Sequence, residues 1–143
     1  MIIDKVNNLK KCLGCSQIKE ATKDNFYFQK GKAHGECKEC SNSPERKLYR
    51  IEYNRRLRLA ALVFYGGEVP RCGCCGESEV KFLGIDHIEG GGNEHRKEMT
   101  QGGLHIYLWL RRNGYPEGFQ VLCHNCNLSK GYYGECPHSI IKK

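Results

Sequence analysis

The sequence has no hydrophobic run long enough to span a membrane, which takes about 20 consecutive apolar residues, so a transmembrane helix is excluded. The N-terminal residues Met1–Lys5 lack the apolar core of a secretory signal peptide, and we therefore expect a cytoplasmic protein. Low-complexity tracts are absent, and no internal repeat occurs apart from short cysteine pairs. The single tryptophan, Trp109, is expected in the core rather than on a base-stacking surface. These absences predict a small folded protein that meets no membrane.

Cysteine is in excess instead, with ten residues in a chain of 143. Such enrichment is typical of a secreted disulfide framework or of an intracellular zinc protein. Eight of the ten fall into four C-x2-C pairs, the spacing at which two thiolates reach one tetrahedral zinc ion. We therefore predict zinc rather than disulfides. Because a chain this small buries little apolar surface, zinc is expected to supply much of its folding free energy.

The first two pairs predict a zinc ribbon over residues 1–43, with 21 residues between the pairs. A short strand is expected at Phe26–Phe28 and a turn at Gly31–Gly35. The four ligands of this first structural zinc are Cys12, Cys15, Cys37 and Cys40.

Residues 44–65 predict a basic helix that links the ribbon to the rest of the chain. Pro44 suits a first helical turn, and Gly66-Gly67 and Pro70 end the element. Apolar residues recur at near-helical spacing at Leu48, Ile51, Leu59 and Leu62. The charge of this stretch is mostly positive and the chain carries +7, so we expect contacts with phosphates, a solvated helix face being the alternative. The expected contacts are Arg46, Lys47, Arg50, Arg55, Arg56 and Arg58.

Residues 66–143 form the expected third part, where the other two C-x2-C pairs close a second structural zinc site with Cys72, Cys75, Cys123 and Cys126 as ligands. Cys74 is left over and is expected to face outward or to pack as a small apolar residue. Cys136-Pro137-His138 has no obvious partner pair and is given no ligand role, and His124 is expected to be exposed. The expected elements are strands at Phe82–Ile88 and Phe119–Leu122, a mobile loop at Gly90–Gly92, a helix over Leu104–Arg112 and a short helix from about Asn127.

Asp86, His87 and Asn127 carry the chemistry that we expect. Zinc joins the cysteine pair before the first strand to the pair before the last helix, so Asn127, next to Cys126, is brought close to Asp86. A carboxylate and an amide oxygen form a hard ligand set that suits a largely hydrated Mg²⁺. A neutral imidazole can accept a proton from water. Together these residues predict a one-metal phosphodiesterase that uses Mg²⁺ or Mn²⁺.

At these residues the chain resembles the HNH endonuclease family. Members with a four-cysteine zinc site show C-x2-C, then Asp-His and an aliphatic residue, then Leu-Cys-x2-Cys-Asn-x2-Lys-Gly. The same pattern stands here as Cys72/Cys75, Asp86-His87-Ile88 and Leu122–Gly131. The resemblance covers residues 71–137 and implies a ββα-metal fold, with His87 as general base and Asp86 and Asn127 as ligands of the divalent cation.

The layout also resembles that of phage-type HNH proteins, which implies DNA as the partner and a bacterial or phage-infected host cell as the location. The middle Asn of the family pattern has no counterpart before the second strand, and Asn93 or Asn113 could take its place. Further expected DNA contacts are His95, Arg96, Lys97 and Lys130, an exposed basic loop being the alternative for the first three. The alternative is a non-catalytic two-zinc regulator that binds nucleic acid. The sequence leaves the oligomeric state open, a monomer being one option.

Overall fold

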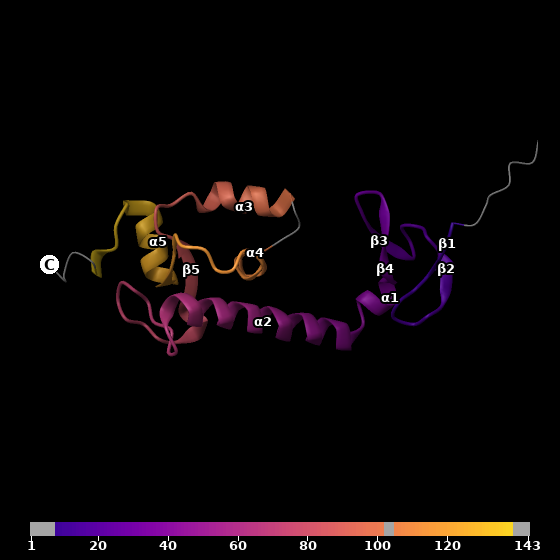
Figure 1. Cartoon of the computed structure of the whole chain (residues 1–143), viewed down its shortest axis with the longest axis horizontal. Coiled ribbons are helices and arrows are strands. Elements are labelled where there is room, and N and C mark those ends of the chain that lie inside the picture. Colours follow the sequence, from indigo (N-terminus) through magenta and orange to yellow (C-terminus); the bar gives the residue numbers. More distant parts are fainter. Residues whose placement is uncertain (1–7, 102–104, 139–143) are drawn as a thin grey trace, which may run out of the picture. The chain divides into compact units, whose positions relative to one another are not determined.

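The computed structural model describes residues 8–101 and 105–138, and the chain divides into two units, Met1–Tyr53 and Asn54–Lys143 (Figure 1). Helices and two-stranded antiparallel sheets make up the units, so the protein is a small α+β protein. Within the described ranges, no helix is both long and apolar enough to cross a membrane. The Met1–Lys5 segment used above, and Leu104 of the expected helix, lie outside the described residues.

Unit 1 contains two hairpins. Strands β1 (Leu9–Lys11) and β2 (Ile18–Glu20) pair around the first cysteine pair, and β3 (Phe26–Gln29) pairs with β4 (Lys32–Cys37). The short helix α1 (Lys38–Ser41) follows and carries Cys40. Among the described residues of unit 1, the buried cluster consists of Cys12, Phe26 and Cys37, which is too little apolar surface to hold a fold by burial.

The turn of the second hairpin is shorter than predicted. Lys30 and Gly31 have positive φ angles of 49° and 77°, and Gln29 pairs with Lys32 across them. Two central residues with positive φ form the tight turn that matches the twist of a hairpin. The predicted turn at Gly31–Gly35 is therefore wrong after Gly31, since the chain re-enters a strand at Lys32.

Helix α2 (Pro44–Gly66) begins at the predicted proline, and the boundary between the units falls within it. The hydroxyl of Ser43 accepts a hydrogen bond from the N–H of Arg46 at 3.2 Å, which is an N-cap interaction. The buried residues of the helix are Leu57, Ala61 and Leu62. Leu48, Ile51 and Leu59 are exposed, so of the apolar residues that predicted the helix only Leu62 faces a core.

Unit 2 is built on one hairpin, in which β5 (Leu83–His87) pairs with β6 (Phe119–Cys123). Between these strands lie α3 (Gly92–Gln101) and α4 (Ile106–Arg112), and α5 (His124–Tyr133) follows β6. A single turn of 3₁₀ helix, η1 (Val80–Phe82), precedes β5. Leu83, Val121 and Leu122 pack with Leu62 and with four cysteines in the core of this unit.

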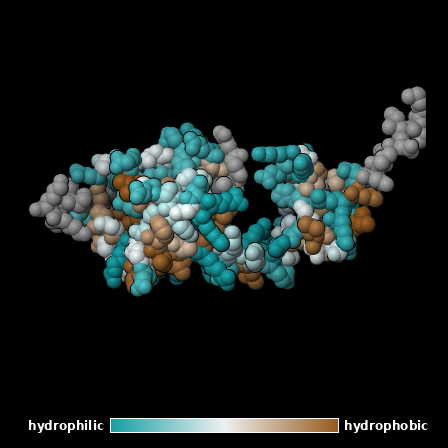
Figure 2. Space-filling model, viewed as in Figure 1, coloured by the Kyte–Doolittle hydropathy of each residue, from teal (hydrophilic) through white to brown (hydrophobic). Residues whose placement is uncertain are grey.

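Both predicted strands and the helix ending at Arg112 are present, but Gly90–Gly92 does not form the expected loop. Gly90 and Gly91 have positive φ angles of 79° and 80° and form a turn, while Gly92 already begins α3. The tight turn places the first turns of α3 beside the end of β5. Elsewhere on the visible face, apolar side chains are scattered among hydrophilic ones (Figure 2).

Candidate functional site

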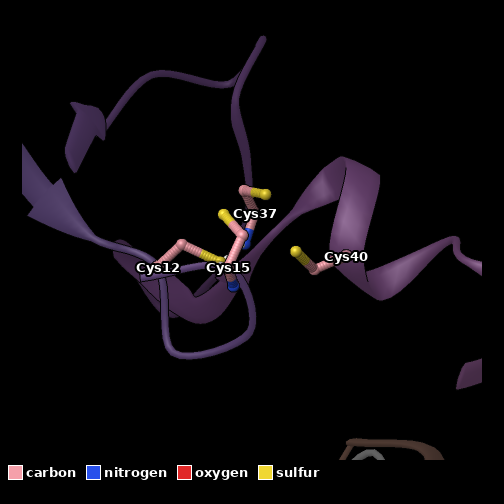
Figure 3. Close-up of side chains that lie close together, drawn as sticks. All are labelled: Cys12, Cys15, Cys37 and Cys40. Atoms are coloured by element: carbon pink, nitrogen blue, oxygen red, sulfur yellow. Dashed lines mark hydrogen bonds between the residues drawn. The ribbon is translucent and has the colours of Figure 1, made fainter. Parts of the chain in front are cut away.

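The four cysteines of unit 1 converge on one point (Figure 3). The sulfur atoms of Cys12, Cys15, Cys37 and Cys40 all lie within 4.8 Å of one another. The N–H groups of Cys37, Cys15 and Gly14 point at the sulfur of Cys12 at 3.2, 3.5 and 3.3 Å. These N–H groups, that of Cys37 most strongly, lower the pKa of Cys12 to about 6. A thiolate stabilised in this way is the form that binds zinc, so this group could hold a zinc ion.

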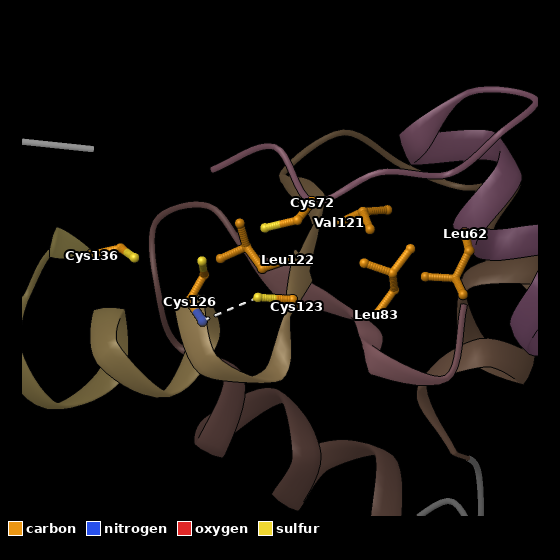
Figure 4. Packing of buried hydrophobic residues seen from close by; sticks show 8 residues of the cluster. All are labelled: Leu62, Cys72, Leu83, Val121, Leu122, Cys123, Cys126 and Cys136. Atoms are coloured by element: carbon orange, nitrogen blue, oxygen red, sulfur yellow. Dashed lines mark hydrogen bonds between the residues drawn. The ribbon is translucent and has the colours of Figure 1, made fainter. Parts of the chain in front are cut away.

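A second group of four is formed in unit 2 by Cys72, Cys75, Cys123 and Cys126. Cys72, Cys123 and Cys126 belong to the buried core (Figure 4), whereas Cys75 is exposed. The sulfurs of Cys75 and Cys123 lie 3.7 Å apart. That separation agrees with the edge of about 3.8 Å expected for a tetrahedron with Zn–S bonds of about 2.3 Å. Burial opposes ionisation of Cys72, but the N–H groups of Cys75, Cys123 and Cys74 outweigh it and lower the pKa of Cys72 to about 6. This group could also hold zinc.

The second cysteine group positions helix α5. The sulfur of Cys123 accepts a hydrogen bond from the N–H of Cys126 at 3.5 Å, so the residue before the helix also caps its N-terminus. Gly134, with a φ angle of 80°, ends the helix in the left-handed conformation that glycine favours. Asn127 and Lys130 therefore project from a helix whose start is fixed to the end of β6.

The candidate site is a cleft of about 670 Å³ where β5, α3 and α5 meet. Asp86 and His87 line it from the end of β5, and Asn127 and Lys130 line it from α5. Gly92 and Arg96 contribute from α3. The three residues for which we expect a chemical role thus line one cleft, although adjacent strand residues point to opposite faces of a sheet. Asp86 and His87 both line the cleft because the strand ends at His87 and the chain turns at Gly90.

The carboxylate of Asp86 is held by two hydrogen bonds. Lys130 Nζ donates to its Oδ2 at 2.6 Å, and Gln120 Nε2, across the hairpin, donates to the same oxygen at 2.8 Å. Lys130 Nζ also donates to the carbonyl oxygens of His87 and Ile88 at 2.6 and 2.9 Å. Lys130 therefore ties α5 to the end of β5. As far as the structure describes the chain, both bonds to the carboxylate use Oδ2, which leaves Oδ1 for a cation.

His87 is paired with a second histidine. Its Nε2 lies 2.8 Å from Nδ1 of His95, and the ring of His95 packs edge-on against Trp109 with centroids 4.2 Å apart. Phe119, the cross-strand neighbour of His87, has its ring centroid 4.7 Å from that of His87. Burial, followed by the charge of His95, lowers the pKa of His87. The ring is therefore neutral at neutral pH, which is the form that accepts a proton.

Gly92 borders the other nitrogen of the same ring. A Cβ atom at position 92 would lie 3.2 Å from His87 Nδ1, closer than most real contacts of a Cβ atom. Glycine there leaves room beside Nδ1 on the side of the cleft.

The basic residues expected at phosphates fall into different surroundings. Arg58 donates to the carbonyl oxygens of Val80 and Leu83 at 2.7 and 2.5 Å, and Arg46 forms an ion pair with Glu36. His95 has its Nδ1 on His87 and its Nε2 buried, so its placement gives no support to a phosphate contact. Lys130 is likewise bonded to protein oxygens. Besides Arg46, the exposed members of the set are Lys47, Arg50, Arg55, Arg56, Arg96 and Lys97.

Two features of the site were not predicted from the sequence. The first is the pairing of His95 with His87, because we expected His95 to contact DNA. The second is a third group of possible metal ligands, which contains Cys74, Cys136 and His138 together with Cys126. Cys74 is half-buried and packs against the core, as one of its two expected placements had it, and His124 is exposed as predicted. The short spacing of Cys136 and His138 was the available signal for the third group.

Comparison of the chain with protein-family models, with curated proteins and with solved structures gives no match.

Proposed function

We propose that the protein is a metal-dependent DNA endonuclease that hydrolyses phosphodiester bonds by a one-metal HNH mechanism. The observation that carries the proposal is that Asp86, His87 and Asn127 line one cleft. Asn127 lies on helix α5, whose N-cap, Cys123, belongs to the second cysteine group. A strand pair followed by a helix, with a carboxylate, an imidazole and an amide at one cleft, supports a hydrolytic centre better than a binding surface.

Mg²⁺ or Mn²⁺ would be held by Oδ1 of Asp86 and by the side-chain oxygen of Asn127. Oxygen donors of this kind suit hard cations, and water and substrate phosphate would complete the coordination. When bound, the cation supplies positive charge that stabilises the phosphate oxygens in the transition state. Lys130 and Gln120 fix the carboxylate, so its free oxygen has a defined direction before the cation binds.

His87 would act as the general base through Nδ1. Its Nε2 would donate a proton to His95 Nδ1, which leaves a lone pair on His87 Nδ1 beside Gly92. A water molecule there loses its proton to Nδ1 as its oxygen attacks phosphorus, the bond from phosphorus to the leaving oxygen breaks, and the leaving oxygen takes up a proton from solvent water. His95 would orient the base, so this assignment needs neither Asn93 nor Asn113.

Cleavage of supercoiled plasmid tests the proposal. We expect the wild-type protein to cut with Mg²⁺ or Mn²⁺ and to stop with EDTA. His87→Ala should lower the rate by about 10²- to 10⁴-fold, the usual contribution of a general base, while zinc content and DNA affinity stay unchanged. Excess Mn²⁺ should partly rescue Asp86→Ala and Asn127→Ala but not His87→Ala.

The matched control is His34→Ala, which removes an exposed histidine of unit 1 and should cut like the wild type. Undiminished cleavage by His87→Ala would exclude the HNH assignment. A wild-type protein that binds DNA but cuts nothing with either cation would be the two-zinc regulator instead.

A further inference from the structure

Cys126 belongs to two groups of possible metal ligands at once. One is the four-cysteine group described above, and the other joins Cys126 to Cys74, Cys136 and His138. In each group the ligand atoms lie within 4.8 Å of one another. Figure 4 shows the side chain of Cys126 between those of Cys123 and Cys136. Cys126 is fully buried, so its sulfur contacts both groups rather than solvent.

Two distances in the additional group are close to those of a tetrahedral zinc site. His138 Nδ1 lies 3.4 Å from the sulfur of Cys126 and 3.5 Å from the sulfur of Cys136. A tetrahedron with Zn–S bonds of about 2.3 Å and a Zn–N bond of about 2.0–2.1 Å has S···N edges of about 3.6 Å. Both distances lie within about 0.2 Å of that edge, and the Cys75–Cys123 distance in the neighbouring group lies within about 0.1 Å of its own.

We propose that unit 2 binds two zinc ions that share the thiolate of Cys126, with Cys74, Cys136 and His138 completing the second ion. A thiolate sulfur has lone pairs enough for two ions, so two tetrahedra can meet at this one corner. The full ligand set is six thiolates and one imidazole.

Charge favours the shared arrangement. A zinc ion with four thiolates carries a net charge of −2. The second Zn²⁺ brings two further thiolates, from Cys74 and Cys136, together with a neutral imidazole, and so adds no net charge. Binding releases the two thiol protons to solvent. The second ion therefore gains two thiolates and an imidazole as ligands without adding to the buried net charge.

The second ion would fix helix α5 at its far end. Cys123 and Cys126 hold the start of α5, while Cys136 and His138 follow its end at Gly134. The segment after Gly134 would then be clamped back onto the core through Cys74, which precedes β5 in the chain. Both ends of the helix that carries Asn127 and Lys130 would be held by metal. This role is independent of whether the cleft cuts DNA.

Cadmium-113 NMR of the full-length protein reconstituted with cadmium-113 tests the cluster. Two metal ions bridged by one sulfur split each other's resonances, whereas an ion in an isolated site gives a single line. We expect three resonances, of which two are mutually split and the third, from unit 1, is not. Elemental analysis of the zinc protein should give about three zinc ions per chain.

The double variant Cys74→Ser/Cys136→Ser should lose one resonance and the splitting, and its zinc content should fall to about two ions. His124→Ala is the matched control, because His124 is exposed at the start of α5 and belongs to none of the ligand groups; it should keep all three resonances. Two unsplit resonances in the wild type would show that unit 2 binds one ion, not two. Three resonances without splitting would show that the two ions of unit 2 do not share the Cys126 thiolate. Both outcomes are read from the wild type, so they stand even if the double variant does not fold.

Discussion

At the scale of single residues, the proposed base depends on its neighbour. His95 Nδ1 lies on His87 Nε2, and the other nitrogen of His95 is buried with no partner among the described residues. An imidazole in a polar site is normally held in one tautomer by a second group, and His95 is that group here. Trp109 and Phe119 flank the pair and keep both rings from rotating away.

His95→Leu should therefore lower plasmid cleavage by about 10- to 100-fold, the range found when a group that orients an imidazole is removed. His95→Asn should recover most of the rate, since the Asn side chain places an acceptor near the position of Nδ1. DNA affinity and zinc content should not change in either variant. If His95 served only to pack the site, the two variants would have equally low cleavage rates. The matched pair therefore distinguishes orientation of His87 from packing.

Sequence reasoning predicted part of this site. Because Asp-His and Cys-Asn are local patterns and the cysteine pairs fix their distance, the convergence of Asp86, His87 and Asn127 on one cleft followed from spacing. Their catalytic roles stay predictions. The His87–His95 contact did not follow, because it depends on a tight turn at Gly90 and Gly91 that brings α3 beside β5. Three glycines in a row favour a mobile loop just as well.

At the scale of elements, helix α2 shows that spacing alone does not predict burial. Its apolar residues recur at near-helical spacing, yet Leu48 is 66% and Ile51 is 51% exposed. Helical periodicity reports the helix but not what it packs against, because the partner surface is set by tertiary structure. The same holds for charge, since Arg58 binds backbone carbonyls and Arg46 pairs with Glu36, both from within the basic run.

Replacing Lys47, Arg50 and Arg55 by Gln should weaken binding to duplex DNA without changing the fold, because all three are exposed. Each lost phosphate contact should lower the slope of log affinity against log salt by about 0.9. Fluorescence anisotropy over a series of salt concentrations measures both quantities. The control replaces Lys11, Lys23 and Lys32, three exposed lysines of unit 1, and removes the same charge. An equal loss in both variants would point to net charge rather than to contacts by α2.

At the scale of the whole molecule, cysteine groups that could hold zinc make up much of the buried core. Among the described residues, one phenylalanine and two cysteines form the buried cluster of unit 1, and four of the eight residues in the main buried cluster of unit 2 are cysteines. The composition indicated this, since the chain of 143 residues has ten cysteines, eight of them in C-x2-C pairs. The third ligand group was not predicted from the sequence because its members come from three separate segments, which only the fold brings together.

The two units should accordingly fail separately when their cysteines are removed. Zinc binding in small zinc domains is worth about 10–16 kcal/mol, as much as the whole stability of an ordinary domain, which is about 5–15 kcal/mol. Loss of one ligand should therefore unfold its own unit. Cys12→Ser should abolish the dispersed amide resonances of residues before Tyr53 in two-dimensional NMR and leave those of unit 2 in place.

Cys123→Ser should do the reverse and should abolish cleavage as well, because Cys123 both joins the cysteine group and caps the helix that carries Asn127. Chelation of all zinc should unfold both units together. Cys12→Ser should keep a measurable fraction of the wild-type cleavage rate, since the cleft that contains Asp86, His87 and Asn127 is lined entirely by residues of unit 2. Loss of both sets of resonances in Cys12→Ser would mean that the units fold as one cooperative body, which the sparse core of unit 1 argues against.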